Sequence, residues 1–240
     1  MNLVVLLPED LVAPDRARLV GRRLAHVREV HRAGVGKELS VGLLGGAMGR
    51  GTVLSLDAEA LEMALVLDQE PPPKLPLTLV IAVPRPKVLN RVVAAATSLG
   101  AARIILLNAW KVEKAYWASP RMGPEYLREQ MLLGLEQAKD TVLPELRLAR
   151  LFRPFVEDEL PALIGAGRAL VAHPGAGGES GLRGEPLTLA IGPEGGLDRG
   201  GAAEPLPRGP APPGPGAPHP SHGNGPGDPG GSAFLESGQE

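Results

Sequence analysis

The chain has 240 residues, 43% hydrophobic and 22% charged, which is enough to bury one large core or two small ones. It contains no cysteine, so disulfides, zinc–thiolate sites, iron–sulfur clusters and cysteine nucleophiles are excluded. The net charge is −2, and no apolar run approaches the roughly 20 residues that a membrane helix needs. The apolar start lacks a basic segment and a small-residue cleavage site, so we expect no signal peptide, no membrane partner and a cytoplasmic protein.

Residues 1–70 are predicted to form a small β-rich domain. A helix is expected over 15–32. Short runs separated by glycine turns follow it and are typical of a small barrel. These runs are 38–44, 49–56 and 60–67. The proline-rich stretch 71–76 is predicted to be a stiff linker and therefore a domain boundary.

After the linker, strands and helices alternate. Continuous apolar runs predict four strands, at 77–83, 103–107, 168–173 and 187–191. One helix is expected over 87–99, with its apolar positions at Val88, Val92, Ala95 and Leu99. A longer helix is expected over 124–141, with Pro124 near its start and Pro144 beyond its end. Repeated β–α–β units with apolar strands predict an α/β domain over 77–199, built on a parallel sheet covered by helices.

Charge is distributed unevenly along the chain. Seven basic residues and one acid lie between Arg16 and Lys37, and six basic residues and no acid lie between Pro71 and Val112. Local basic fields on a nearly neutral chain favour a polyanion as partner, although solvated helix faces remain an alternative. The candidate RNA-contacting cations are Arg22, Arg23, Arg28, Arg32, Lys87 and Arg91.

The most specific motif is Ile191-Gly192-Pro193-Glu194-Gly195-Gly196-Leu197, which follows an apolar strand. Ligands of open α/β sheets bind beyond the carboxyl ends of the strands, and glycines allow a close approach of the backbone. The spacing matches neither a Walker loop nor a dinucleotide-binding fingerprint, so a phosphate cradle is not expected. A plain Gly-Pro turn is the alternative. His173-Pro174 follows another strand end and would line the same crevice, although a polar loop residue is the alternative for a single histidine.

Two further groups have both a functional and a structural interpretation. Lys87, Arg91, Lys111 and Lys114 lie near strand ends or in the first turn of the following helix, where they would contact phosphates or simply be solvated. Trp110, Tyr116 and Trp117 share one loop and would either stack on bases or pack that loop against the domain. No Ser-His-Asp set can be assembled, and the histidines show no metal-ligand spacing, so no metal site is predicted.

Several segments together resemble a known family. They are the Gly192–Gly196 loop, His173-Pro174, the run 92–101, Glu136-Gln137-Ala138 with Val142-Leu143-Pro144-Glu145, and the stretch 26–36. They look like the corresponding segments of the bacterial 16S ribosomal RNA uracil-N3 methyltransferases. The resemblance covers about residues 20–198.

The resemblance implies an N-terminal RNA-binding barrel of the PUA type and a C-terminal methyltransferase domain of the SPOUT class with a trefoil knot. It also implies S-adenosylmethionine as cofactor, a homodimer, and N3 methylation of a uridine in the 16S rRNA of the small ribosomal subunit. The cofactor-binding residues would be Ile191, Gly192, Pro193, Glu194, Gly195 and Gly196, with His173 and Pro174 nearby. No catalytic residue can be assigned.

The sequence departs from the family after the Gly-Pro-Glu-Gly-Gly loop. Family members continue with a Leu-Gly-x-Arg-Ile-Leu-Arg-x-Glu-Thr-Ala segment that threads the knot and completes the cofactor pocket. In this chain, the last 41 residues hold 11 of the 32 glycines and 10 of the 26 prolines. Such a composition is not expected to build the last helices, so the predicted pocket is incomplete and one apolar sheet face is exposed.

A lost reading frame explains this tail. With synonymous codons, residues 218–225 can be written CCG CAT CCT TCG CAC GGA AAC GGC, followed by the C of Pro226. Read one base later, this sequence encodes Arg-Ile-Leu-Arg-Thr-Glu-Thr-Ala, which is the missing motif. We therefore interpret residues 200–240 as the out-of-frame reading of a family-type terminus, with the frame lost soon after Leu197. Two rival functions remain open: a non-catalytic RNA-binding protein, and a knotted methyltransferase that acts on another RNA nucleotide.

Overall fold

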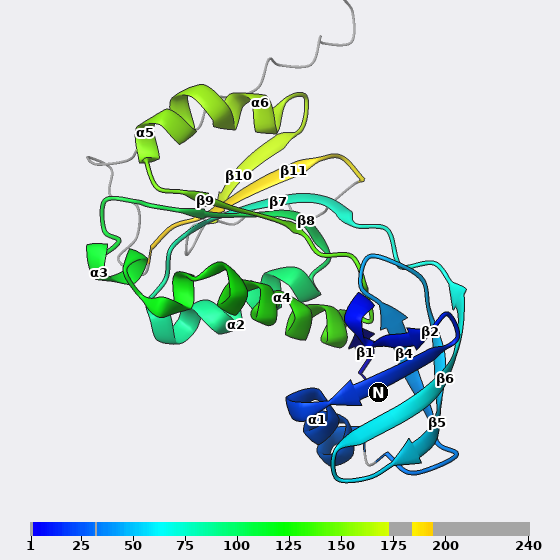
Figure 1. The fold of residues 1–240 in the computed structure, drawn as a ribbon. Coiled ribbons are helices and arrows are strands. Elements are labelled where there is room, and N and C mark those ends of the chain that lie inside the picture. Colours follow the sequence, from blue (N-terminus) through cyan, green and yellow to red (C-terminus); the bar gives the residue numbers. More distant parts are fainter. Residues whose placement is uncertain (1, 32, 173–183, 194–240) are drawn as a thin grey trace, which may run out of the picture. The chain divides into compact units, whose positions relative to one another are not determined.

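The strands form two sheets, one from residues 4–69 and one from residues 75–191 (Figure 1). The structure is a computed structural model that describes residues 2–31, 33–172 and 184–193. All the elements below belong to one unit, Met1–Gly209. The fold is mixed α/β, as the sequence predicts.

The N-terminal sheet has six strands in the order β1-β4-β5-β6-β3-β2. They are β1 (Val4–Leu6), β2 (Leu11–Ala13), β3 (Arg16–Val20), β4 (Glu38–Leu43), β5 (Met48–Leu56) and β6 (Ala60–Gln69), with the short 3-10 turn η1 (Pro8–Asp10) and the helix α1 (Gly21–His31) between them. β1 pairs with β4 in parallel, and every other pair is antiparallel. Leu24 and Val27 of α1 pack into the core of this sheet, so the helix belongs to the same hydrophobic unit.

The expected helix over 15–32 is wrong in its first part. Residues 16–20 form β3, in which Arg16, Arg18 and Val20 are exposed while Ala17 and Leu19 are fully buried. That alternation has the period of a strand, and β3 pairs with β6 along its whole length. The helix begins only at Gly21, whose φ of +60° makes the corner between the two elements.

The C-terminal sheet has five parallel strands in the order β10-β11-β7-β8-β9. They are β7 (Leu75–Ala82), β8 (Ala101–Leu107), β9 (Glu145–Ala149), β10 (Arg168–Ala172) and β11 (Leu187–Ile191). The four predicted strands and their parallel arrangement are confirmed, whereas β9 was not predicted. β7 also takes up Leu75 and Pro76, so only 71–74 of the expected linker lies outside regular structure.

Helices cover both faces of this sheet (Figure 1). They are α2 (Pro86–Ser98), α3 (Lys114–Trp117), η2 (Pro120–Met122), α4 (Pro124–Ala138), α5 (Phe152–Pro154), η3 (Phe155–Glu159) and α6 (Leu160–Ile164). α2 and α4 pack on one face, against a core that includes Leu79 and Ile104. α5, η3 and α6 pack on the other face, against Val80 and Ile105. Within the described ranges, none of the helices has the length and apolar character to cross a membrane.

The buried face of α2 differs from the predicted one. Leu89, Val93 and Ala96 are buried, whereas Ala95 and Leu99 are exposed and Leu99 is 60% accessible. The surface of the helix has two adjacent apolar stripes whose residues have the same spacing. Packing against α4 buries the stripe that contains Leu89, Val93 and Ala96 instead of the predicted one. α4 likewise ends at Ala138 rather than at 141, because Lys139 adopts a left-handed conformation with φ of 54°.

The close approach of α2 and α4 depends on Gly134. A Cβ atom there would lie 2.5 Å from the Ala94 carbonyl oxygen and 2.6 Å from Thr97 Cβ. Alanine raises helix propensity by about 1 kcal/mol, but overpacking against backbone costs about 1–3 kcal/mol. We therefore expect Gly134→Ala to lower the free energy of unfolding by about 1 kcal/mol in urea titrations. Gly34→Ala is the control because no atom lies within 4 Å of its added Cβ, and a Gly134→Ala chain as stable as wild type would contradict the packing argument.

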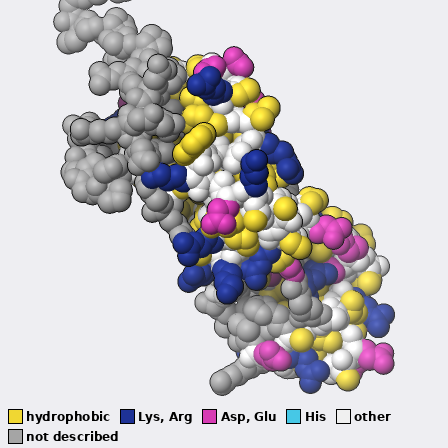
Figure 2. Space-filling model, turned by 90° about the vertical axis from the view of Figure 1, so that its left-hand side faces the viewer, with side chains coloured by type: hydrophobic (Ala, Val, Ile, Leu, Met, Phe, Trp, Pro, Cys, Tyr) yellow, Lys and Arg dark blue, Asp and Glu magenta, His cyan; other side chains and the backbone are white. Residues whose placement is uncertain are grey.

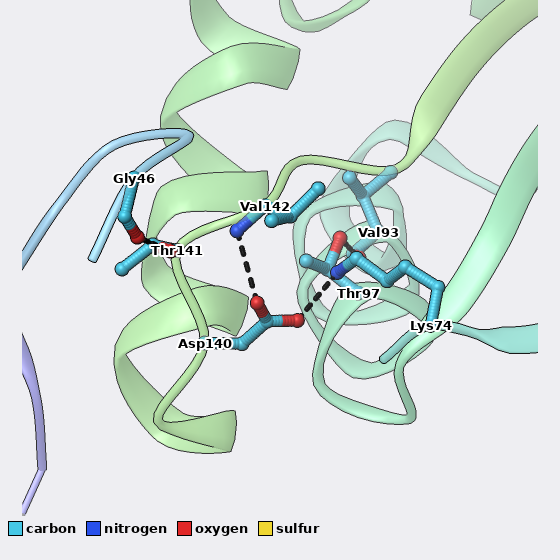
Figure 3. Close-up of polar contacts among 7 residues, drawn as sticks. All are labelled: Gly46, Lys74, Val93, Thr97, Asp140, Thr141 and Val142. Atoms are coloured by element: carbon cyan, nitrogen blue, oxygen red, sulfur yellow. Dashed lines mark hydrogen bonds and ion pairs between the residues drawn. The ribbon is translucent and has the colours of Figure 1, made fainter. Parts of the chain in front are cut away.

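The end of α4 is joined to the N-terminal sheet and to the segment before β7 (Figure 3). Asp140 Oδ2 lies 2.6 Å from Lys74 Nζ, and Asp140 Oδ1 accepts a 2.9 Å hydrogen bond from the Val142 amide. Thr141 Oγ1 donates to the Gly46 carbonyl oxygen at 2.6 Å, and the Gly45 amide donates to the Thr141 carbonyl oxygen at 2.8 Å. Asp140 and Thr141 are almost fully buried, so these polar groups are satisfied within the protein.

A candidate active site at the carboxyl edge of the parallel sheet

The order of the strands marks one edge of the C-terminal sheet as a ligand site. From β7 the chain moves outward through β8 to β9, and then returns to the other side of β7 to add β10 and β11. The strand order therefore reverses between β7 and β11. In open parallel sheets, such a reversal leaves a crevice outside the carboxyl ends of the strands. This edge bears α3 and the start of α2 (Figure 1).

The predicted cofactor loop starts at this point of reversal. Ile191 is the last residue of β11 and is in register with Ile81 of β7 and with Ala172 of β10. Gly192 and Pro193 follow it directly. The ends of β10 and β11 are therefore adjacent, and His173, which lies outside the described residues, follows β10 in the sequence.

Most of the predicted cofactor-binding residues lie outside the described residues. These are His173, Pro174, Glu194, Gly195 and Gly196. The described part of the site is Ile191, which is 38% exposed, with Gly192 and Pro193. It presents an apolar, side-chain-poor surface next to the buried end of β7, which suits a flat heterocycle held by backbone groups.

The predicted RNA-contacting cations occupy different environments. Lys87 and Arg91 are exposed and lie one turn apart in the first part of α2, which follows the carboxyl end of β7. Arg28 is exposed on α1. Arg23 forms a two-contact ion pair with Asp10, which is 4% exposed, so its guanidinium also has a structural role. The side chain of Arg22 and all of Arg32 lie outside what the structure describes.

The loop after β8 is held by residues that the sequence did not single out. The Asn108 amide donates to the Ala149 carbonyl oxygen at 2.9 Å, and Asn108 Nδ2 donates to the Arg150 carbonyl oxygen at 3.1 Å. Trp117 Nε1 donates to Asn108 Oδ1 at 3.0 Å, and the Arg150 guanidinium lies 5.2 Å from the Trp117 ring centroid. The sequence could have pointed to Asn108 only through its position directly after a predicted strand.

Tyr116 in this loop has a shifted pKa. Burial raises the pKa of Tyr116 above the usual value of 10.0. The hydrogen bond that its hydroxyl donates to Glu113 Oε1 at 2.9 Å makes a second, smaller contribution in the same direction. The raised pKa favours the protonated phenol, whose hydroxyl donates to Glu113 in the structure.

A cavity of about 150 Å³ lies away from this edge, between β1, α1 and α4. Its lining is mainly apolar, including Val5, Val27 and Leu132, with Glu129 and Glu136. The volume is below the roughly 300–1,000 Å³ of small-molecule pockets, so we do not assign a ligand to it. In the described segments, no three acidic or histidine side chains come together as metal ligands, and the expectation that the chain holds no metal stays a prediction.

The outer strands next to the candidate site are only partly covered. Leu170 and Val171 of β10 and Ile191 of β11 are each about 40% exposed, whereas the carboxyl-terminal parts of β7 and β8, residues 77–82 and 104–107, are buried. Leu170 lies on the face that α2 and α4 cover further along the sheet, since it is in register with Leu189, which packs against that core. An apolar side chain exposed there leaves room for a further covering element.

The comparisons with known proteins agree with this arrangement. A family model described as an RNA methyltransferase domain matches residues 70–201. The ribosomal RNA small subunit methyltransferase E of Treponema pallidum is 30% identical over 203 residues, which cover 81% of this chain and 76% of that protein.

Solved structures show the same fold. A ribosomal RNA small subunit methyltransferase E from Neisseria gonorrhoeae, bound to S-adenosyl methionine, superposes with a TM-score of 0.61 at 17% identity, over 83% of this chain and 82% of that one. A putative methyltransferase from Legionella pneumophila in complex with SAM gives a TM-score of 0.60 at 18% identity, over 82% and 83% of the two chains.

Proposed function

The chain belongs to the RNA methyltransferase family that includes the ribosomal RNA small subunit methyltransferases E, and on this premise we propose that its body is built to methylate N3 of a uridine in 16S rRNA. The observation that carries this proposal is the match over residues 70–201, which contains the sheet reversal and the Gly192-Pro193 loop at its carboxyl edge. The ribosomal substrate implies a cytoplasmic location.

S-adenosylmethionine is the proposed cofactor, and it would supply an electrophilic methyl group on a sulfonium. Ile191, Gly192 and Pro193 fit one side of such a ligand, because Ile191 and Pro193 offer apolar side chains and Gly192 offers a backbone that no side chain shields. Their role would be to hold the reacting groups in line. The uridine N3 must lose its proton, and its base must leave the stack to reach this edge.

The domain division follows from the same proposal. Residues 1–70 would be a PUA-like RNA-binding barrel that uses Arg22, Arg23, Arg28 and Arg32, and 71–76 would be the linker. Residues 77–199 would be the SPOUT domain, and its knot would need a C-terminal segment of the family type. Residues 200–240 would be the out-of-frame tail. A homodimer is part of the proposal as well.

The identity of the product tests the reaction. A chain with the frame restored after Leu197 would be incubated with unmodified small ribosomal subunits and the cofactor, and the rRNA would be digested to nucleosides for mass spectrometry. We expect 3-methyluridine. A methyl group on another nucleoside would overturn the N3 assignment, and the absence of any methylation would overturn the enzyme proposal for this body.

Phosphate binding at the edge of the sheet is tested with α2. We expect the double variant Lys87→Ala, Arg91→Ala to bind 16S rRNA more weakly and to reduce the slope of log K against log salt by about 1.4, or roughly 0.7 for each phosphate that is no longer neutralised. Arg103→Ala is the matched control, because Arg103 lies near the amino end of β8 and pairs with Glu145 at 2.7 Å. An equal decrease in affinity in both variants, measured by filter binding, would contradict a specific role for the α2 cations.

A further inference from the structure

The three aromatic side chains of the loop after β8 have separate environments. Trp117 packs against the core, donates a hydrogen bond to Asn108 and lies under the Arg150 guanidinium. Tyr116 also packs against the core. Trp110, by contrast, is 89% exposed, the highest value among the large hydrophobic side chains of the described residues. Packing within the chain therefore explains two of the three aromatics and leaves Trp110 without an explanation.

Trp110 is exposed although packing and hydrogen bonds hold the backbone around it in place. Ala109, directly before Trp110, and Val112, two residues after it, are each only 8% exposed. The Val112 amide donates to the Ala109 carbonyl oxygen at 2.9 Å and closes a tight turn with Trp110 at its tip. Asn108, one residue earlier, is hydrogen-bonded to the end of β9. The turn thus holds a large apolar ring in solvent on an anchored backbone.

Trp110 also lies at the edge of the sheet that carries the candidate site. It lies three residues beyond the end of β8, the strand next to β7, and therefore at the same edge of the sheet as the Gly192-Pro193 loop. Lys87 and Lys114 are exposed in the elements that follow β7 and β8. Figure 2, which views the molecule from this side, shows Lys and Arg side chains gathered next to hydrophobic ones. An exposed indole at the same edge of a sheet as exposed cations is a combination that suits the binding of single-stranded nucleic acid.

We propose that Trp110 stacks on an unpaired base of the RNA substrate and so positions the RNA at the carboxyl edge of the sheet. The inference rests on the proposed function, since it assumes that RNA is the ligand. Every base has a π-face, so this stacking would be tolerant of sequence and would add affinity rather than base identity. Lys114 would neutralise a neighbouring phosphate. Trp110 would be a positioning residue.

The test compares RNA binding by the 240-residue chain and its variants. The probes are a single-stranded pyrimidine-rich RNA and a duplex of the same length. We expect Trp110→Ala to weaken binding of the single strand by about 5- to 100-fold, and Trp110→Phe to recover most of that affinity because the phenyl ring still stacks. Leu99→Ala is the matched control, since Leu99 is also exposed but lies just before the amino end of β8, and it should bind like wild type.

Fluorescence gives a second readout. The chain has two tryptophans, and Trp110 is the exposed one, so stacking should quench the emission of the wild type when the single strand is added. In Trp110→Phe the quenching should disappear while binding persists. The salt slope should be the same in wild type and Trp110→Ala, because the substitution removes no cation.

The outcomes separate the two proposals. If the wild type binds neither RNA, the proposed function fails and the inference fails with it. If the wild type binds the single strand and Trp110→Ala binds equally well, only the inference is overturned. Equal affinity of the wild type for duplex and single strand would also overturn it, because a stacked duplex offers no free base face.

Discussion

Restoring the reading frame after Leu197 should convert this chain from one that binds S-adenosylmethionine weakly or not at all into one that binds it at micromolar concentration. The physical reason is the composition of the last 41 residues, which hold 11 glycines and 10 prolines and are therefore not expected to form the helices that complete the pocket in the family. Cofactor affinity needs a pocket that buries most of the ligand, and a tail rich in glycine and proline is not expected to supply the missing wall. Isothermal titration calorimetry of both chains measures the difference.

A chain that ends at Leu197 is the control for this experiment. It should bind the cofactor no better than the 240-residue chain if the last residues add nothing to the pocket. The partly exposed Leu170 and Val171 supply a second readout, because helices formed by the restored frame would cover part of β10 and reduce the binding of a hydrophobic dye. Micromolar cofactor binding by the 240-residue chain would refute the prediction.

The gene gives an independent check of the same interpretation. The codons for residues 218–225 must allow the one-base shift that produces Arg-Ile-Leu-Arg-Thr-Glu-Thr-Ala. If no single-base change upstream brings that motif into frame with the Gly192–Gly196 loop, the frame interpretation is wrong. The tail lies outside the described residues, so this check does not depend on the structure.

The central strands could be predicted from the sequence because their environment is uniform. Residues 77–82 of β7 and 104–107 of β8 are buried on both faces, and such continuous burial gives a mainly apolar run. β9 lies at the edge, and its residues Glu145 and Arg147 pair with side chains on other elements, so the apolar run is interrupted. β3 was not predicted because its exposed arginines resemble the polar face of a helix. Its alternation of exposed and buried residues also extends over only five residues, which is too short to identify a strand from the sequence.

The candidate site could be predicted only in part. The Gly192–Gly196 motif is contiguous, and the sequence alone places it at the end of a strand. The support for the loop after β8 is not contiguous, because Asn108 is held by Ala149 and Arg150, more than 40 residues away. The sequence also grouped Trp110, Tyr116 and Trp117, and only the three-dimensional packing separates the exposed indole from the two rings that pack against the core.

Replacing Asp140 by alanine should strongly destabilise the chain. The Asp140 side chain is 4% exposed, and its carboxylate joins Lys74, which precedes β7, to the Val142 amide after α4. Its removal would leave the Lys74 ammonium, itself only 15% exposed, without its ionic partner. Breaking such a pair costs about 3–5 kcal/mol, and we expect about 3 because Lys74 still reaches water. At this chain length, that destabilisation corresponds to a fall in Tm of about 6–12 °C.

Two variants separate the buried pair from a general effect of charge. Asp140→Asn keeps an acceptor for the Val142 amide and should lose less stability than alanine. Glu62→Gln removes the exposed pair with Arg18, whose side chains are 43% and 50% accessible, and should change the free energy of unfolding by less than about 1 kcal/mol. Thermal unfolding followed by circular dichroism ranks the three variants. If Asp140→Ala shifts Tm no more than Glu62→Gln does, the Lys74–Asp140 pair does not hold the end of α4 to the start of β7.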